Sequence, residues 1–414
     1  MTHTSTAPSP AQVSLAWTAA REAAFEAGRA AALDPIVAPL SACDGATLAE
    51  DLRPRTDLPA FPTSSVDGYA VRGPQPWRIT GRVLAGDRAD EIGADGTGVE
   101  IATGAMVPAD AEAILRVEDA THADGAVRGT PRPEREWRMP GDEAARGDVL
   151  VPAGTPVTPA VIGLAAASGH DDLRVRPRPK AVLLVFGDEL LTAGAPAAGR
   201  IRDSLGPQLP SWLRRLGVDM ATPGVIGPIE DTLDAHVAAI RDALASGVDL
   251  ILTTGGTMHG PVDHLHPSLE EIGAEYAVNT VEVRPGFPML LASVPRPDGG
   301  ATLLAGLPGN PQSAVVALVS LVVPALLGLT GRRLPHFPTI ELGAAIPGRG
   351  GYTHLALVRR SSDDRAYPLG HAASSMLRGL AQAVGFALIP PHGQGSAGDR
   401  VPLVPLPLLL GEHP

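Results

Sequence analysis

The sequence predicts an α/β protein of several domains, in which helices cover both faces of a mostly parallel sheet. Three observations lead to this prediction. Strand-like and helix-like segments alternate from about residue 178 to 330, two of the strands end in glycine-rich turns, and short β-like segments flank this region on both sides. We therefore expect a central α/β domain, a β-rich inserted domain and a small C-terminal β domain.

The alternation in the central region rests on two hydrophobic periodicities. Short apolar runs are the strand candidates, at residues 181–186, 249–253 and 301–306. Apolar side chains at helical spacing mark the helix candidates, at 207–216, 232–246 and after Pro311. This order of elements is typical of a parallel sheet that is covered on both faces.

Two of these strands run into glycine-rich turns. The first turn is Thr254-Gly255-Gly256-Thr257-Met258-His259-Gly260, and the second is Gly306-Leu307-Pro308-Gly309-Asn310-Pro311. Such turns present backbone N–H groups at the carboxyl edge of a sheet, where α/β folds hold phosphorylated ligands. Either turn alone is as well explained by a structural β–α connection. Two of them in one domain favour a site for an anionic, phosphorylated small molecule.

The flanking regions contain shorter β-like segments. An Ala-rich helical run covers residues 11–33, and Gly, Pro and Asp interrupt the β-like pieces between 61 and 139. The C-terminal strand candidates are 353–358, 385–389 and 400–404. Pro-rich segments at 131–140, 176–179 and 334–338 are the candidate domain boundaries.

Composition excludes several classes of function. The 414 residues are 44% hydrophobic and 19% charged, as in soluble globular proteins. The net charge is −12, the basic residues are nearly all arginine because Lys180 is the only lysine, and they form no basic stripe, which argues against nucleic acid as the main partner. The single cysteine, Cys43, excludes an internal disulfide and a multi-cysteine metal site.

We also expect no membrane partner and a cytoplasmic location. The N-terminus lacks the basic start and apolar stretch of a signal peptide. The longest apolar run, 314–329, is shorter than the roughly 20 residues that span a bilayer and contains Ser320 and Pro324. A buried helix is the better interpretation of this run.

Acidic side chains in turns are the candidate catalytic and metal-binding residues. Asp188 and Glu189 follow strand 181–186 and so belong to the same carboxyl edge, where paired carboxylates suit a Mg²⁺ ion shared with phosphate oxygens. Asp67, Thr103 and Glu143 lie in turns outside the α/β region. Helix caps, Asx-turns and solvated hairpins are the structural alternatives for these clusters.

Taken together and in order, the motifs resemble the MoeA/gephyrin-E family of molybdopterin molybdenumtransferases, from about residue 12 to 411. The motifs that carry the resemblance are Ser65-Val66-Asp67-Gly68-Tyr69-Ala70-Val71-Arg72, Thr103-Gly104-Ala105, Val117-Glu118-Asp119, Gly187-Asp188-Glu189-Leu190, Thr254-Gly255-Gly256, Gly260 with Asp263, Arg284-Pro285-Gly286 and Leu307-Pro308-Gly309-Asn310-Pro311. Each piece alone is weak, whereas the ordered set is specific.

The resemblance implies a homodimer of four-domain chains. The expected domains are 12–60 with 140–178 as the N-terminal domain, 61–139 as the β-rich inserted domain, 179–330 as a three-layer α/β molybdopterin-binding domain, and 336–411 as the C-terminal β domain. It also implies an enzyme that takes adenylylated molybdopterin, inserts molybdate and releases AMP with the help of Mg²⁺.

The same resemblance assigns roles to single residues. The expected catalytic residues are Asp67, Thr103, Glu189 and Glu143, and the expected metal ligands are Asp188 and Glu189. The expected substrate-binding residues are Gly255, Gly256, Gly260, Asp263, Arg284, Pro308, Gly309, Asn310, Ser374 and Ser375.

Six residues depart from the pattern that this family implies. Arg284 and Phe287 each replace a lysine, His266 a lysine or arginine, Leu205 an asparagine, Asp142 a glutamate and Glu143 an aspartate. Because molybdate is a dianion that needs fixed positive charge, a second hypothesis stays open. It is a catalytically weakened protein that binds molybdopterin or a nucleotide as a carrier or regulator. A third, an adenylyltransferase with the same Thr-Gly-Gly turn, is disfavoured by the large inserted and C-terminal regions.

Overall fold

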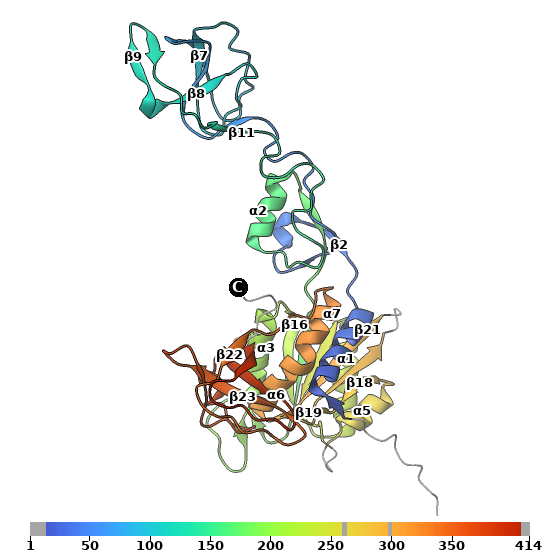
Figure 1. Cartoon of the computed structure of the whole chain (residues 1–414). Helices are drawn as coiled ribbons and strands as arrows, with labels where there is room; N and C mark the ends of the chain where they lie inside the picture. Colours follow the sequence, from blue (N-terminus) through green and yellow to red (C-terminus); the bar gives the residue numbers. More distant parts are fainter. Residues whose placement is uncertain (1–13, 259–262, 297–299, 407–414) are drawn as a thin grey trace, which may run out of the picture. The chain divides into compact units, whose positions relative to one another are not determined.

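The computed structural model describes residues 14–258, 263–296 and 300–406. Within these residues the chain forms two compact units (Figure 1). The larger unit comprises the described parts of Met1–Ile36, Gly45–Ala49 and Val175–Pro414, and the smaller unit comprises Val37–Asp44 and Glu50–Arg174.

A six-stranded sheet forms the centre of the larger unit, in the order β16-β13-β17-β21-β20-β18. The strands are β13 (Lys180–Phe186), β16 (Asp219–Ile229), β17 (Leu250–Thr254), β18 (Glu275–Asn279), β20 (Leu290–Pro295) and β21 (Ala301–Leu307). The first four strands of the sheet order are parallel, as expected, whereas β20 pairs antiparallel with both β21 and β18 and so runs against the other five strands. The connection from β20 to β21 is too short for a crossover, so these strands can only pair antiparallel.

Helices cover both faces of this sheet, which confirms the three-layer α/β arrangement. Leu183 faces one core together with α1 (Trp17–Ala30), α3 (Leu205–Arg215), α6 (Pro311–Ala317) and α7 (Val323–Leu329). Leu184 faces the other core, with α4 (Leu233–Ala245) and α5 (Leu265–Glu271). Both faces of β13 are apolar because successive side chains of a strand point to opposite layers.

A long apolar helix lies within the first of these cores. The π-helical segment η3 (Leu318–Val322) joins α6 to α7, so the helix runs from Pro311 to Leu329. Among the described residues it is the one helix long and apolar enough to cross a membrane, but 94% of its apolar 18-residue stretch is buried inside the protein. Its α7 part crosses α1 closely, since a Cβ on Gly28 would lie 2.1 Å from Ala325 O. The run behaves as a core helix, in agreement with the sequence.

A second sheet of the larger unit is formed mainly by C-terminal residues, in the order β1-β19-β23-β25-β26-β22, with β24 paired to β23. The strands are β1 (Leu15–Ala16), β19 (Val281–Arg284), β22 (Thr339–Glu341), β23 (Thr353–Arg360), β24 (Ala366–Pro368), β25 (Gly385–Ile389) and β26 (Arg400–Pro405). The three C-terminal strand candidates are thus confirmed. The pairing of β19 with β23 was not foreseen, and it brings Arg284 beside His354.

The smaller unit contains a four-stranded sheet in the order β6-β7-β5-β8, of which β7 and β8 are labelled in Figure 1. Its strands are β5 (Gly68–Arg72), β6 (Arg78–Val83), β7 (Thr97–Ile101) and β8 (Ala113–Arg116). Shorter ribbons pair β4 (Thr63–Ser64) with β11 (Trp137–Arg138) and β9 (Thr121–Ala123) with β10 (Ala126–Arg128), and α2 is Pro159–Ala167. Five short strands remain. β3 (Thr47–Leu48), β14 (Leu190–Leu191) and β15 (Ile201–Arg202) belong to the larger unit, and β2 (Ile36–Pro39) and β12 (Asp172–Arg176) lie where the chain passes from one unit to the other.

Candidate functional site

Three loops meet at the carboxyl edge of the α/β sheet, because β13, β17 and β21 are parallel neighbours. The Gly255 N–H donates to Leu307 O at 2.9 Å, and a Cβ on Gly309 would lie 3.8 Å from Gly255 Cα. Gly255 and Gly256 have φ of +82° and +66°, a region in which glycine is favoured. Both glycine-rich turns predicted from the sequence therefore lie side by side.

A pocket of about 730 Å³ lies beside these turns, between the α/β sheet and the C-terminal sheet. It contains four of the predicted substrate-binding residues, Arg284, Pro308, Asn310 and Ser374. The remaining lining residues are Met258, Pro285, Gly286, Phe287, Pro288, Ser313, Gly348, Arg349, Tyr352, His354, Ala372 and Ala373. Gly255, Gly256 and Gly309 belong to the adjoining turns rather than to the lining.

The charges in this pocket favour an anion. Arg284 and Arg349 contribute two guanidinium groups, and none of the described lining residues is a carboxylate. Burial lowers the pKa of His354, and the nearby Arg349 charge lowers it further, although the hydrogen bond from Nδ1 to Pro347 O at 2.9 Å opposes this. His354 is therefore neutral near pH 7, its Nδ1–H donates to Pro347 O, and among the described lining residues the positive charge of the pocket comes from the two arginines alone. On a chain of net charge −12, this is a local positive field.

Ser374 is held at the pocket by Gln312. The Gln312 backbone N–H donates to Ser374 O at 3.0 Å, and its side-chain amide, turned to donate, reaches Ala372 O at 3.0 Å and Ala373 O at 3.1 Å. Gln312 is only 1% exposed. The sequence analysis missed this residue, although its position directly after Asn310-Pro311 was a usable signal. Ser375, by contrast, is exposed and does not line the pocket.

Two predicted metal ligands, Asp188 and Glu189, are exposed in the loop after β13. Asp188 N–H donates to Asp231 Oδ2 and Asp231 N–H donates to Asp188 Oδ1, both at 3.4 Å. Asp231 was missed because β16, which it follows, was not recognised as a strand. β16 is an edge strand that contains Pro223 and Pro228, and proline weakens a strand signal.

A buried histidine, His236, lies next to the Asp188–Asp231 carboxylate pair. The centres of the His236 and Phe186 rings are 3.7 Å apart in a stacked arrangement, and His236 Nε2 is 3.5 Å from Asp231 Oδ1. A Cβ added at Gly256 would lie 4.0 Å from His236 Cε1. Neither ring nitrogen has a hydrogen-bond partner among the described residues. Burial lowers its pKa, and the Asp231 charge opposes this. His236 thus links the Thr254-Gly255-Gly256 turn to the carboxylate pair.

The smaller unit brings Asp67 and Thr103 together. Asp67 precedes β5 and Thr103 follows β7, and the antiparallel pairing of these strands makes the two residues neighbours. Asp67 Oδ1 accepts from Thr103 N–H at 2.6 Å and from the Thr103 hydroxyl at 2.9 Å. These hydrogen bonds lower the pKa of the Asp67 carboxyl, and the one from the Thr103 backbone N–H has the larger effect. Asp67 and Glu143 are exposed.

The residues that depart from the expected pattern have structural surroundings of their own. Leu205 is 4% exposed and packs in the larger core, where it begins α3. Asp203 Oδ1 caps that helix by accepting from the N–H groups of Leu205 and Gly206, both at 2.9 Å. His266 Nδ1 shares a 2.7 Å hydrogen bond with the Tyr276 hydroxyl, whose pKa burial raises to about 12.

Two predicted substrate-binding residues, Gly260 and Asp263, lie at and just after the end of the first glycine-rich turn in the sequence. Asp263 lies just before α5 and is half-buried. Gly260 lies outside the described residues.

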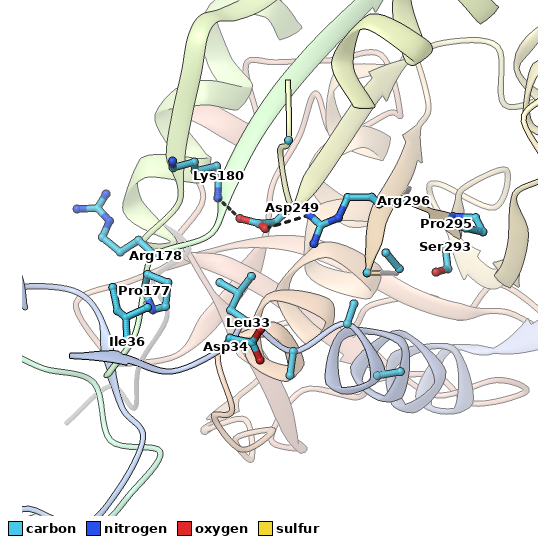
Figure 2. A pocket seen from close by; sticks show the side chains of 16 residues that line it. Leu33, Asp34, Ile36, Pro177, Arg178, Lys180, Asp249, Ser293, Pro295 and Arg296 are labelled. Carbon is cyan, nitrogen blue, oxygen red and sulfur yellow. Dashed lines mark hydrogen bonds and ion pairs between the residues drawn. The ribbon is translucent and has the colours of Figure 1, made fainter. Parts of the chain in front are cut away.

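A second pocket, of about 770 Å³, lies at the opposite edge of the sheet, where β13, β17 and β21 begin (Figure 2). Asp249 accepts from Lys180 N–H at 2.8 Å and pairs with Arg296 at 3.7 Å. In Figure 2 the side-chain ends of Arg178 and Lys180 point away from Asp249. Because its cations do not converge, this pocket is the weaker candidate for an anion.

Three family models match the chain. They are the MoeA N-terminal region (domain I and II) at residues 15–169, a probable molybdopterin binding domain at 182–328, and the MoeA C-terminal region (domain IV) at 339–406. A relative named molybdopterin molybdenumtransferase 2 from Mycobacterium tuberculosis is 33% identical over 377 residues, which cover 86% of this chain and 91% of the relative. Molybdopterin molybdenumtransferase from Synechococcus elongatus is 30% identical over 360 residues, 83% of this chain and 87% of its own length.

The fold has a match among solved structures as well. The molybdopterin biosynthesis MoeA protein from Pyrococcus horikoshii superimposes with a TM-score of 0.75 at 24% identity, covering 95% of this chain and 99% of that one. The family models, the curated relatives and the shared fold agree over nearly the whole length. This chain therefore belongs to the MoeA family.

Proposed function

We propose that this protein is a molybdopterin molybdenumtransferase of molybdenum cofactor biosynthesis. It inserts molybdate into adenylylated molybdopterin and releases AMP. The observation that carries the proposal is the pocket beside the two glycine-rich turns, because it holds Arg284 and Arg349 and no described carboxylate. A phosphorylated pterin and a molybdate dianion both require such a combination of backbone donors and fixed positive charge.

The residues of this edge have distinct roles in the proposal. The N–H groups at Gly256 and Gly309 bind phosphate oxygens, since only glycine lets an anion approach the backbone so closely. Gly255, whose own N–H donates to Leu307 O, holds the two turns together. Arg284 holds the molybdate, and Ser374 adds a hydroxyl donor from the other wall of the pocket. Asn310 and Asp263 contact the pterin and the nucleotide.

A Mg²⁺ ion fits beside Asp188 and Glu189 if the substrate phosphates supply part of its ligands, rather than the protein alone. The described residues contain no group of three or more potential ligands that could hold a metal. Mg²⁺ needs only one or two carboxylates when substrate phosphates and water supply the rest, and Asp188 and Glu189 meet that need. When bound, the ion would neutralise charge on the adenylate phosphates during AMP release.

Three expectations from the sequence remain part of this proposal. A homodimer would allow a second copy of the chain to supply Asp67, Thr103 and Glu143 to the reaction that uses Glu189. The four domains would have the boundaries 12–60 with 140–178, 61–139, 179–330 and 336–411. The protein would work in the cytoplasm, where its small-molecule substrates are made, without nucleic acid or membrane partners.

A second candidate function is a binding protein with weakened catalysis. It is favoured by Phe287, which presents an aromatic ring to the pocket where a cation would help to hold a dianion, and by Leu205, which is buried in the core and presents no polar group. Such a protein would bind the pterin or a nucleotide and insert no metal.

One experiment separates these functions. The purified protein is incubated with adenylylated molybdopterin, Mg²⁺ and molybdate, and AMP release and reconstitution of an apo-molybdoenzyme are measured. The transferase releases AMP and activates the apo-enzyme, whereas the binding protein shows only binding, which calorimetry detects in the low-micromolar range. A folded protein that binds neither molybdopterin nor its adenylylated form contradicts both functions.

A further inference from the structure

The guanidinium of Arg284 lies on the faces of two aromatic rings in the anion pocket. Its Cζ is 4.4 Å from the centre of the Tyr352 ring and 5.4 Å from that of Phe287. The two rings meet edge to face, with centroids 5.7 Å apart and an interplanar angle of 86°. All three residues line the pocket beside the glycine-rich turns.

Sheet register and one glycine turn bring these three side chains together. The parallel pairing of β19 with β23 places Arg284 opposite His354, and Tyr352 lies just before β23. Phe287 follows Gly286, whose φ is +106° and whose added Cβ would lie 3.0 Å from Met289 Cε. The chain therefore turns sharply after β19 and returns the Phe287 ring to the Arg284 side chain.

Stacking orients a guanidinium without using its hydrogen-bond donors. A cation–π contact engages the flat face of the group, whereas the five N–H bonds of arginine lie in its plane and point outward. An arginine held in this way keeps its donors directed at an oxyanion in the pocket. A flexible arginine would first have to lose side-chain freedom on binding the anion.

We propose that Tyr352, with Phe287 at its edge, is a positioning residue that holds the Arg284 guanidinium ready for a tetrahedral oxyanion. The identity of the oxyanion as molybdate rests on the proposed function. The aromatic face of Tyr352 orients the Arg284 guanidinium, and the Tyr352 hydroxyl group has no part in this.

The test compares variants at Tyr352 with a matched stack outside the pocket. Tyr352→Leu keeps apolar volume but removes the aromatic face, and Tyr352→Phe keeps the face but removes the hydroxyl. The control is Tyr367→Leu, because Arg359 lies 5.3 Å from the Tyr367 ring in the same sheet and neither residue lines the pocket. Binding of molybdate alone, and of tungstate and sulfate, is measured by calorimetry on the full-length protein.

We expect Tyr352→Leu to bind molybdate about 3- to 10-fold more weakly, the range typical of a partly desolvated cation–π contact. Tyr352→Phe and Tyr367→Leu should stay within about twofold of the wild type. In the cofactor-forming assay, the Tyr352→Leu loss should appear in the KM for molybdate, and the rate at saturating molybdate should recover.

Several results would overturn the inference. These are wild-type affinity in Tyr352→Leu, an equal loss in Tyr352→Phe, an equal loss in the control, or no oxyanion binding by the wild type. If Tyr352→Leu does not fold, Phe287→Leu tests the same stack and should weaken binding by a smaller factor. An unchanged affinity in Phe287→Leu then overturns it. A wild-type protein that binds molybdate in the expected pattern but forms no cofactor contradicts the proposed function and leaves the positioning role intact.

Discussion

Gln312 offers a sharp test of how the pocket is built. Its amide donates to Ala372 O and Ala373 O, and its own backbone N–H donates to Ser374 O. Gln312→Leu keeps most of the side-chain volume and removes both amide donors, whereas the backbone bond to Ser374 remains. The change should therefore loosen the 372–374 segment without opening a large cavity.

The expected size of the effect follows from the two carbonyl groups. A buried acceptor that loses its partner costs about 1–3 kcal/mol. Ala372 is half-buried and Ala373 is exposed, so water can replace part of what is lost. We therefore expect local anchoring to weaken by about 2 kcal/mol in total, which corresponds to roughly a 30-fold increase in the open population of the segment.

Limited trypsin digestion measures this opening directly. Arg378 lies in the same exposed stretch and is a cleavage site, and cleavage tracks the open population when opening and closing are fast. The control is Thr302→Val, because the Thr302 hydroxyl is also fully buried and donates to Val248 O at 2.8 Å, at the start of β21. It removes a buried hydrogen bond from the same unit and leaves the pocket untouched.

Gln312→Leu should accelerate cleavage after Arg378 at least tenfold and raise the KM for molybdate. Thr302→Val should lower global stability by a similar amount but change neither the cleavage rate nor the KM. Equal cleavage rates in the wild type and Gln312→Leu would refute the anchoring role. Equal acceleration by both variants would attribute the effect to global destabilisation.

Four further predictions concern the reaction, the charge in the pocket, pH and assembly. Asp67→Asn and Glu189→Gln should each lower AMP release by roughly 10² while binding of the pterin survives, and wild-type turnover in both would make these carboxylates structural. Phe287→Lys should raise molybdate-dependent cofactor formation several-fold, since one well-placed charge is worth about 1–3 kcal/mol and outweighs the smaller loss of the Phe287 contact with Arg284. A wild type that already saturates at micromolar molybdate, with no gain in the variant, would contradict this. Burial raises the pKa of Asp110, but hydrogen bonds from Gly93 N–H, Ile92 N–H and Arg72 outweigh it and lower the pKa to about 2. The ionised carboxylate therefore stabilises the fold above the usual pKa of 3.8, and this stabilisation is lost as pH falls toward 2. The difference in urea midpoint between wild type and Asp110→Asn should be largest near pH 6 and should narrow below pH 4. Light scattering should give twice the chain mass at micromolar concentration, and a fully active monomer would exclude a shared site.

The sequence alone determined the parts of the fold that depend on local pattern. The alternation of apolar strands with amphipathic helices was sufficient to predict β13, β17, β21, α3 and α4 within a few residues. The glycine-rich turns were recognisable from their composition, and in the first of them the positive φ of Gly255 and Gly256 favours glycine. A parallel sheet then places all such turns at one edge, so the main features of the phosphate site followed from local information.

Only the tertiary structure decided which side chains meet in the pocket. Arg284 reaches Tyr352 because β19 leaves the α/β region and pairs with β23, and Gln312 reaches residues 372–374 from the start of α6. The Asp188–Asp231 pair depends likewise on the position of β16 beside β13. These contacts join residues that are tens of positions apart in the chain. Sheet register and core packing select them, and neither leaves a periodic signal in the sequence.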